Sequence, residues 1–404
     1  MGKLIVLMIT AFIDMVGLLM ILPILPFYAK SLGASGFVVG LLVSSFAIAQ
    51  LLSAPMWGRF SDRYGRRPAL LVGLSASAIA YVIFAYAGSL WLLFLSRLVQ
   101  GAGGGTVSVI QAYVADAMRP EERAKGLGWL SAATNAGVAL GPALGSVSLG
   151  LGRHAPGLLA AALCAINVLF ASRFLTESRD MVEARANTPH PGRSREAVMK
   201  VITHSDEPAA RLIWIYAIAI GSFQGVTTIL ALFLAMRFGV NERTIGFFFV
   251  YIGVISVVTR LFILGWAVDR FGEARLSRLG TVLLALGLAT LPFTHPVTFL
   301  PYLPLALSVA LIPLGTAFTF PCVTALLSRV VPSNERGLYM GVQQTFGGSA
   351  RVLFPGLAGW AFDRFPALPF LVSAVLVAGT ILLGLGMEEY LRPKPEPQAA
   401  TTAA

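Results

Sequence analysis

Long apolar runs separated by short polar turns make up most of this chain. Runs long enough to cross a bilayer lie at 4–28, 36–57, 69–88, 90–115, 124–150, 155–175, 210–235, 244–267, 276–294, 298–327, 337–360 and 367–387. A spanning helix needs about 20 mainly apolar residues. The pattern therefore predicts an all-α integral membrane protein with twelve transmembrane helices, whose even number places both termini on one side.

One long polar segment divides the runs into two groups of six. Residues 176–208 carry interleaved acidic and basic side chains. We expect a six-helix bundle at 1–175, a linker at 176–208, a second six-helix bundle at 209–388 and a disordered tail at 389–404. A short surface helix is expected within the linker, around 195–203.

The two halves repeat each other in sequence. A Gly-Asp-Arg-Gly pattern after the second run recurs after the eighth, and a Glu-Arg pair before the fifth run recurs before the eleventh. The matching residues are Gly58, Asp62, Arg63 and Gly65 with Gly265, Asp269, Arg270 and Gly272, and Glu122-Arg123 with Glu335-Arg336. Such duplication is typical of secondary transporters, whose substrate site lies between the halves near the bilayer midplane.

Composition agrees with a membrane protein. Of the 404 residues, 56% are hydrophobic and 12% are charged, whereas soluble domains average about 25% charged residues. The net charge of +11 comes from basic residues in short turns between apolar runs. This is the pattern of cytoplasmic loops rather than of a nucleic-acid surface. We therefore expect an inner-membrane protein with cytoplasmic termini and no nucleic-acid partner.

The turn after the second run is the most basic in the chain. An aqueous, cytoplasmic position suits its arginines, and Asp62 precedes a helix whose positive end would attract a carboxylate. Its notable residues are Gly58, Asp62, Arg63, Gly65, Arg66 and Arg67. Two interpretations remain open. The turn, together with Asp116, acts as a gate between conformations, or it is a loop that only sets the orientation of the protein in the membrane.

Two charged residues lie deep in the first half. Asp14 stands about ten residues into the first run, about 15 Å from its start. A carboxylate at this depth is costly and is a functional candidate by default. Arg97, at a similar depth in the fourth run, is its natural counter-charge. The pair is either a proton-coupling switch or a permanent structural contact.

Two arginines lie inside apolar runs of the second half. Arg260 and Arg351 either face a cavity and favour an anionic group, or extend to an interface.

Glycine-rich stretches indicate close helix packing. Gly101–Gly105 has no preceding strand and no following Gly-Lys-Ser/Thr, so a nucleotide loop is disfavoured. Gly137, Gly141 and Gly145 would let the fifth helix approach a neighbour, and Pro142 would kink it.

These residues together resemble the major facilitator superfamily, and within it the twelve-helix drug:proton antiporters such as the tetracycline exporters. The turn 58–67 resembles the family's signature between helices 2 and 3, Arg97-Leu-Val-Gln100-Gly101 its fourth-helix signature, and 137–145 its antiporter signature. Two departures are that Ser146 stands where a second glycine is usual, and that the third run lacks the carboxylate of tetracycline exporters.

The resemblance implies alternating access, in which one bundle moves against the other around a central site. A cluster of Asp62, Arg63, Arg66 and Asp116 would join helices 2, 4 and 11 and stabilise an outward-open state. Asp14 would take up protons from outside, so that proton entry drives export of amphipathic, drug-like molecules. The residues expected to line the cavity are Phe46, Gln50, Gln111, Asn135, Phe223, Gln224, Tyr251, Arg260, Gln343, Gln344 and Arg351.

Two rival functions are a transporter of a metabolite, such as a sugar, an organic anion or a lipid, and a membrane-embedded enzyme. The four histidines are scattered, and no zinc-protease, serine-hydrolase or Walker sequence occurs. The two cysteines, Cys164 and Cys322, lie inside apolar runs, so neither a disulfide nor a metal site is indicated. We expect no enzyme activity, no cofactor and no metal; the expected partners are a small-molecule substrate, protons and the bilayer, and we expect a monomer.

Overall fold

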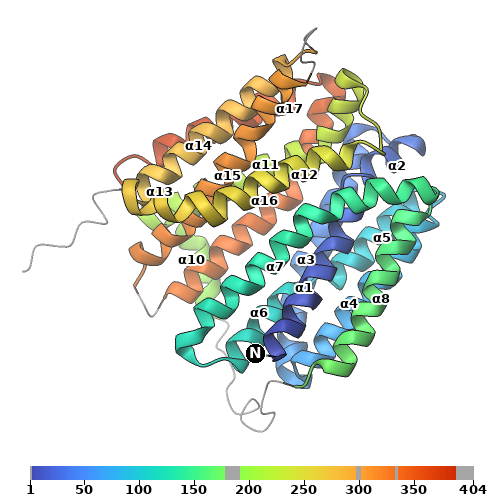
Figure 1. Ribbon diagram of the computed structural model, residues 1–404. Helices are drawn as coiled ribbons and strands as arrows, with labels where there is room; N and C mark the ends of the chain where they lie inside the picture. The colour runs from blue at the N-terminus through green and yellow to red at the C-terminus, as the bar shows by residue number, and fades with distance from the viewer. Residues whose placement is uncertain (1, 178–191, 297–301, 333–334, 388–404) are drawn as a thin grey trace, which may run out of the picture.

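The computed structural model describes residues 2–177, 192–296, 302–332 and 335–387, and within them all regular structure is helical. Two groups of helices lie side by side, one formed by the chain before the linker and one by the chain after it (Figure 1). The predicted tail at 389–404 and most of the linker, 178–191, lie outside the described residues.

The first half contains eight helices and one short turn of 3₁₀ helix. They are α1 (Gly2–Ile21), α2 (Leu25–Ser31), α3 (Gly36–Tyr64), α4 (Arg66–Ala85), α5 (Leu90–Ala102), α6 (Thr106–Ala117), α7 (Pro120–Ser148), η1 (Leu149–Leu151) and α8 (Ala155–Phe174).

The second half follows a linker helix, α10 (Gly192–Thr203). Its elements are α11 (Pro208–Phe238), α12 (Ile245–Val258), the π-helical η2 (Thr259–Ile263), α13 (Leu264–Phe271), α14 (Glu273–Thr290), the 3₁₀ turn η3 (Leu291–Phe293), α15 (Leu303–Val330), α16 (Arg336–Arg364) and α17 (Leu368–Leu383).

Eight helical spans of the described residues are long and apolar enough to cross a membrane, and α5 and α17 are shorter apolar helices. Large apolar side chains also cover the outside, with Leu52 70%, Trp91 69%, Phe262 75% and Val375 72% exposed. Apolar surface on this scale needs lipid around it. The chain is therefore a multi-pass membrane protein. The count of twelve spans, and the boundaries of the four parts of the chain, stay predictions.

Two predicted spans are broken in the structure. The run 4–28 is split at residues 22–24, which separate α1 from α2, and the run 90–115 is split at Gly103–Gly105, which separate α5 from α6. Hydropathy averaged over a window does not detect such breaks, because one proline or three uncharged glycines change the mean of a long apolar run only slightly.

The folded molecule has two faces at which its helices begin and end, and we name them by their position relative to the linker. We call the linker face the end at which α8 ends and α11 begins, and the opposite face the other end. α1 begins beside the end of α8 (Figure 1). Arg211 at the start of α11 donates from Nε to the carbonyl of Leu383 at 2.7 Å, so α17 also ends at the linker face.

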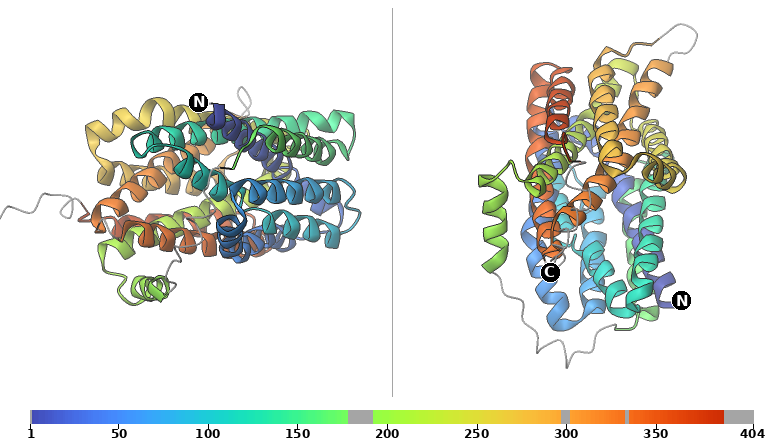
Figure 2. Two further views of the ribbon diagram at one scale, coloured as in Figure 1. Left: turned by 90° about the horizontal axis from the view of Figure 1, so that it is seen from below. Right: turned by 90° about the vertical axis from the view of Figure 1, so that its left-hand side faces the viewer.

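The surface helix predicted around 195–203 is confirmed as α10. It lies outside both bundles (Figure 2). Ala197 and Val201 are buried against α11 and α16, while Met199 and Ile202 are half exposed. Lys200 Nζ lies 3.0 Å from Glu207 Oε2, and this hydrogen bond raises the pKa of Lys200. An amphipathic helix of this kind suits the membrane surface.

Candidate functional site

Asp14 lies inside the first half, just past the middle of α1. Its side chain is 6% exposed, and Thr106 Oγ1 donates a hydrogen bond of 2.8 Å to Asp14 Oδ2. A small cavity of about 30 Å³ adjoins it, lined in part by Phe46, Gln50 and Tyr81. Asp14 is therefore directed at neighbouring helices and a cavity rather than at lipid.

Glycines place Thr106 against Asp14. The glycine segment Gly101–Gly105 lies where α5 gives way to α6, packed between α3 and α4. A Cβ on Gly105 would lie 2.5 Å from the ring of Trp57, and one on Gly101 would collide with the carbonyl oxygen of Phe46. Larger residues would push α6 away. The expectation that this segment serves close packing is confirmed.

Arg97 is 1% exposed in α5 but forms no ion pair with Asp14, both residues lying in the described part of the chain. Its guanidinium carbon lies 5.6 Å from the centre of the Phe84 ring, and its Nε and Nη2 have no hydrogen-bond partner. The predicted direct pair is therefore absent from this conformation. Arg97 is a buried cation that this conformation leaves largely unpaired.

Tyr81 and Gln100, which sequence reasoning did not select, accompany Asp14 and Arg97. Gln100 Nε2 donates to Tyr81 Oη at 2.7 Å, and both residues line the cavity beside Asp14. Gln100 Oε1 is buried without a partner. Only the proximity of Gln100 to Arg97 in the sequence could have drawn attention to it.

The charged turn forms a compact cluster at the linker face. Arg66 lies 3.0 Å from Asp62 through Nη1 and 2.9 Å from Asp116 through Nε, and Nη1 also donates to Ser61 at 2.7 Å. These contacts join α3, α4 and α6. The predicted extension to helix 11 is not among them, and residues 333–334, just before α16, lie outside the described part.

The remaining residues of the turn divide into packed and exposed positions. Arg67 Nη2 donates to the carbonyl of Ser172 at 2.5 Å, whereas Arg63 is exposed beside the Tyr64 ring. Gly65 has φ +104°, which favours glycine. A Cβ on Gly58 would meet nothing within 4 Å, so no close approach of a neighbouring helix requires glycine there.

Glu177 completes this cluster and was missed from the sequence. Its two carboxylate oxygens accept from the backbone N–H groups of Arg66 at 2.9 Å and Arg67 at 3.0 Å. It thus satisfies two of the open donors at the start of α4, where a negative charge is also favourable. No sequence signal links Glu177 to a helix 111 residues earlier.

The fifth-helix glycines pack α7 against α1, as predicted. A Cβ on Gly137 would lie 2.6 Å from the carbonyl oxygen of Phe12, and one on Gly141 would lie 2.8 Å from that of Val16. Gly145 meets Met20 in the same way. Small residues here allow two long helices to touch along their backbones.

Pro142 and Ser146, on another side of α7, contact the second half. Ser146 Oγ accepts from the backbone N–H of Gly246 at 2.9 Å and donates to the carbonyl of Glu242 at 3.0 Å. A Cβ on Gly246 would collide with the carbonyl oxygen of Pro142. Ser146, where the resemblance leads one to expect glycine, therefore fastens α7 to the start of α12.

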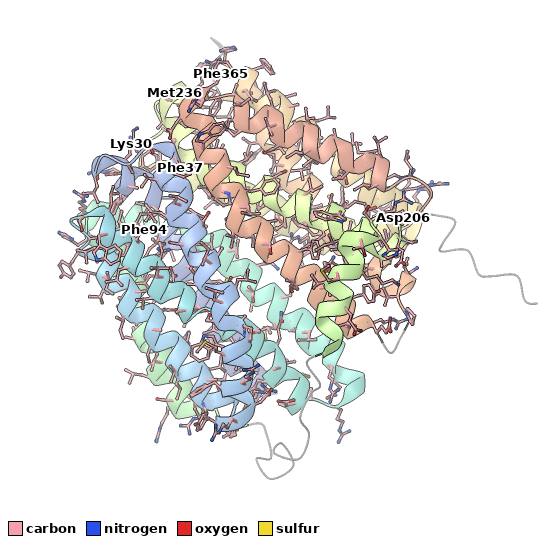
Figure 3. The ribbon with its side chains drawn as sticks, turned by 180° about the vertical axis from the view of Figure 1, so that it is seen from behind. Lys30, Phe37, Phe94, Asp206, Met236 and Phe365 are labelled. Carbon is pink, nitrogen blue, oxygen red and sulfur yellow. The ribbon has the colours of Figure 1, made fainter. Side chains whose placement is uncertain are left out.

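The helices α3 and α16 form a second contact between the halves. Asp363 Oδ1 and Oδ2 accept from the N–H groups of Gly36 at 2.7 Å and Phe37 at 2.8 Å, and Ser44 Oγ donates to the carbonyl of Val352 at 2.6 Å. Figure 3 shows Phe37 and Phe365, two residues from Asp363, at the opposite face, and Asp206 at the linker face. The contacts therefore close the opposite face.

Toward the linker face the halves have fewer contacts. Arg260 Nη1 donates to Asn135 Oδ1 at 3.3 Å in the middle of α7. Nearer the linker face than this pair, no hydrogen bond or ion pair joins the halves within the described ranges.

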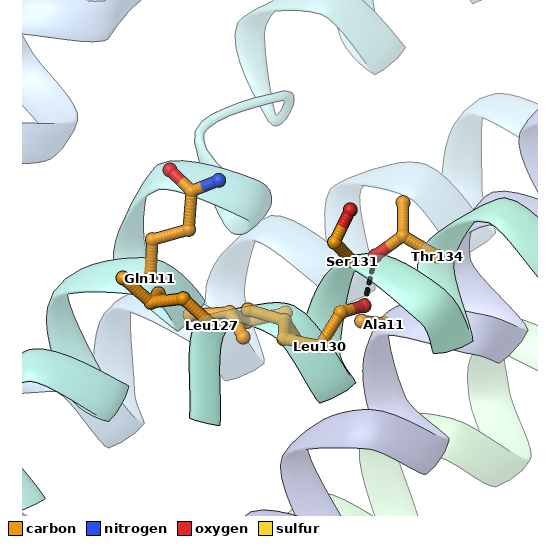
Figure 4. A pocket seen from close by; sticks show the side chains of 7 residues that line it. Ala11, Gln111, Leu127, Leu130, Ser131 and Thr134 are labelled. Carbon is orange, nitrogen blue, oxygen red and sulfur yellow. Dashed lines mark hydrogen bonds between the residues drawn. The ribbon is translucent and has the colours of Figure 1, made fainter. Parts of the chain in front are cut away.

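A pocket of about 310 Å³ opens on this side, between α1, α6 and α7 (Figure 4). It begins at Ala11, one helical turn from Asp14, and carries the hydroxyl groups of Ser131 and Thr134. A second, very small cavity of about 10 Å³ lies between the halves beside Gln224.

The predicted cavity residues do not form one lining. Phe46 and Gln50 line the cavity of Asp14, Gln111 lines the larger pocket, and Asn135 bonds to Arg260. The others are distributed as follows: Gln224 in the small cavity, Phe223 packed in the second-half core, Gln343 fully buried against Thr324, Gln344 exposed, Arg351 3.5 Å from Tyr216 Oη, and Tyr251 in a groove between α12 and α15.

No group of three or more histidine, cysteine or acidic residues that could hold a metal ion occurs in the described part of the chain. The arrangement is one of buried charges, hydroxyl groups and a pocket within the first bundle.

A family model of the Major Facilitator Superfamily matches residues 7–355 and 212–403. The chain belongs to this superfamily. It is 31% identical over 332 residues to the class G tetracycline resistance protein of Vibrio anguillarum, with 81% of this chain and 82% of that protein covered. It is 27% identical to multidrug resistance protein 2 of Bacillus subtilis, with 98% and 96% covered.

Solved structures of superfamily members share this fold. The nucleoside transporter NupG superposes with a TM-score of 0.76 at 16% identity, with 98% of this chain and 100% of that chain covered. The human organic anion transporter MFSD10 superposes with a TM-score of 0.69 at 22% identity, with 95% and 99% covered. The predicted superfamily fold is thereby confirmed.

Proposed function

We propose that this chain exports small amphipathic, drug-like molecules by alternating access, driven by protons moving the other way. The relatives named for multidrug and tetracycline resistance support export of such compounds. The orientation that best fits the basic turns has the linker face and both termini in the cytoplasm of the inner membrane. We further propose that the transporter works as a monomer and releases its substrates chemically unchanged.

The buried carboxylate of Asp14 is the observation that carries the proton-coupling proposal. It is held by Thr106 at 2.8 Å and lies one helical turn from the pocket that begins at Ala11. An isolated charge at this depth has an unfavourable solvation free energy. Asp14 therefore favours the protonated form when the site is closed and the charged form when the site is open to water. Arg97, buried nearby with free donors, would respond to the loss of that charge.

The observed conformation fits one stage of this cycle. The contacts of Asp363 and Ser146 close the opposite face, and within the described residues the pair of Asn135 and Arg260 is the last hydrogen bond between the halves toward the linker face. A substrate would enter the 310 Å³ pocket from the cytoplasm in this state. The volume lies at the lower end of the range for small-molecule sites.

Asp14→Asn tests the proposal. We expect proton-driven uptake of a dye panel into inverted vesicles to be lost in this variant, because the amide cannot carry a proton through the cycle. Asp14→Glu should retain part of the activity, and Asp269→Asn, an exposed acid at the end of α13, should retain all of it. The thermal midpoint of the purified protein checks that each variant is folded.

The same vesicle assay distinguishes drug export from the rival function, transport of a metabolite. If Asp14→Asn transports as the parent does, with the same pH dependence, Asp14 does not couple protons. Uptake of a sugar, an organic anion or a lipid probe in place of the dyes would favour a metabolite transporter. Arg260, a partly buried cation whose Nη1 meets only the neutral side chain of Asn135, is the observation that supports an organic anion among these.

A further inference from the structure

Arg260 is a partly buried cation of the second half that faces α7 and has no acidic partner among the described residues. It stands in the π-helical segment η2, midway along the span formed by α12, η2 and α13. Its Nη1 donates to Asn135 Oδ1 at 3.3 Å, and its Nε is buried without a hydrogen-bond partner. No carboxylate of the described residues forms an ion pair with it.

This arrangement is unfavourable unless something else uses the guanidinium. Arg260 is partly buried, its Nε is withdrawn from solvent without a partner, and a neutral amide at 3.3 Å offsets little of that desolvation. A π-helical segment also interrupts the regular backbone bonds of a helix and is frequent at functional sites. Two independent features, one of the backbone and one of the side chain, therefore coincide at Arg260.

Arg260 lies at the boundary between the two halves, beyond the close contact of α7 with α12. Toward the opposite face, α12 packs on α7 through Gly246 and Gly253; a Cβ on Gly253 would lie 3.0 Å from Ala139 Cα. Arg260 is about two helical turns beyond that contact, at the last hydrogen bond between α7 and this span among the described residues. A solute that enters between the halves can therefore approach the guanidinium.

A pocket of the first half, lined by α1, α6 and α7, lies next to Asn135 along α7. Asn135 Nδ2, on the residue that Arg260 contacts, donates to the carbonyl of Ser131 at 2.7 Å and lies 3.3 Å from its hydroxyl. Ser131 is part of the 310 Å³ pocket, whose other walls include Ile110, Leu127 and Leu130 (Figure 4). The pocket thus offers an apolar surface, with hydroxyl groups on the side toward Arg260.

We infer that Arg260 and this pocket form a binding site for amphipathic molecules that carry an anionic group. The anionic group displaces Asn135 from the guanidinium and the apolar body lies against Leu127 and Leu130. Arg260 is then the residue that determines charge selectivity among exported compounds. The inference rests on the proposed function, because it names the substrate class of the same transporter.

The test uses two dyes with the same xanthene frame and different charge. Fluorescein is anionic and rhodamine 123 is cationic. Binding of each dye to the purified, detergent-solubilised transporter is measured by fluorescence polarisation, for the parent and for Arg260→Gln, Arg260→Lys and Arg237→Gln. Arg237, at the end of α11 near the opposite face, contacts His295 and serves as the matched control.

We expect the parent to bind fluorescein more tightly than rhodamine 123. Arg260→Gln should weaken fluorescein binding by about 10-fold or more and leave rhodamine 123 unchanged or tighter, because only the anion loses a charged partner. Arg260→Lys should recover part of the fluorescein affinity, and Arg237→Gln should match the parent. A merely structural role would weaken both dyes together.

Two outcomes overturn the inference. One is a parent that prefers the cationic dye or does not discriminate; the other is an Arg260→Gln variant that is folded by its thermal midpoint and keeps its preference for fluorescein. Because binding is measured without a proton gradient, it can fail while proton-driven efflux of other dyes persists. Conversely, charge-selective binding without any proton-driven transport would count against the proposed function alone.

Discussion

At the scale of single residues, the hydrogen bonds between carboxylates and the starts of distant helices could not be predicted from the sequence. Asp14 stands out because it interrupts an apolar run, and Asp62 because it lies in a repeated turn. Glu177 and Asp363 have no such signal, yet each accepts hydrogen bonds from two backbone N–H groups of a distant helix. Their partners are set by the packing of the bundle, which a linear pattern does not contain.

Glu177→Ala should destabilise the first half. It removes two charge-assisted hydrogen bonds from the start of α4, and losing such a cap typically costs about 1 kcal/mol. We expect a lower thermal midpoint of the purified protein, followed by tryptophan fluorescence. Glu335→Ala is the matched control, because Glu335 precedes α16 without a side-chain capping bond. Equal shifts in the two variants would show that Glu177 does not act as a cap.

At the scale of elements, the hydrophobic pattern located the helices but not their interruptions. The breaks at 22–24 and Gly103–Gly105, and the π-helical turn at Thr259–Ile263, all fall inside runs that read as continuous. The break between α5 and α6 depends on what the neighbouring helix presents, since glycines there lie against Phe46 and Trp57. The elements that shape the candidate site were therefore the ones least predictable from the sequence.

Gly40→Val should prevent α3 and α16 from closing the opposite face. A Cβ there would collide with the carbonyl oxygen of Pro355 and lie 2.9 Å from Gly356 Cα, and backbone atoms cannot rotate away. We expect efflux to fall by about 10-fold or more, because such overpacking typically costs about 1–3 kcal/mol. A cysteine introduced at Val43, which lines the small cavity between the halves, should be labelled faster from the opposite face by an impermeant maleimide.

The control for this variant is Gly379→Val in α17, where a Cβ would meet nothing within 4 Å. It should leave both efflux and labelling unchanged. If Gly40→Val exports dyes at the parent's rate, the close contact between α3 and α16 is not needed for the cycle.

At the scale of the whole molecule, α3 and α16 form an antiparallel pair with a carboxylate at the end of each helix. Gly36 faces Asp363, Gly40 faces Pro355, and Ser44 faces Val352, so the end of each helix lies beside the start of the other. In this conformation Asp363 caps the start of α3, while Asp62, at the far end of α3, pairs with Arg66. In this conformation the carboxylate at one end of the helix pair caps the partner helix, whereas the carboxylate at the other end does not.

The asymmetry predicts that Asp363 holds the opposite face closed. Asp363→Ala removes both acceptors from the N–H groups of Gly36 and Phe37, and we expect the closed population to fall about 10-fold, equivalent to about 1.4 kcal/mol. Spin labels on cysteines at Lys30 and Phe365, both at this face (Figure 3), report the change as longer distances in double electron–electron resonance. Asp363→Asn should be intermediate, because its amide keeps one acceptor oxygen.

The matched variant for this measurement is Asp206→Ala, an exposed acid at the linker face. It should leave the distance distribution of the parent unchanged. An unchanged distribution in Asp363→Ala would mean that the glycine contacts and Ser146 close the face unaided. A shift toward longer distances would instead give the helix pair two charged ends that act in turn, with Asp363 in the observed state and Asp62 in the other, since a carboxylate stabilises whichever helix start it reaches.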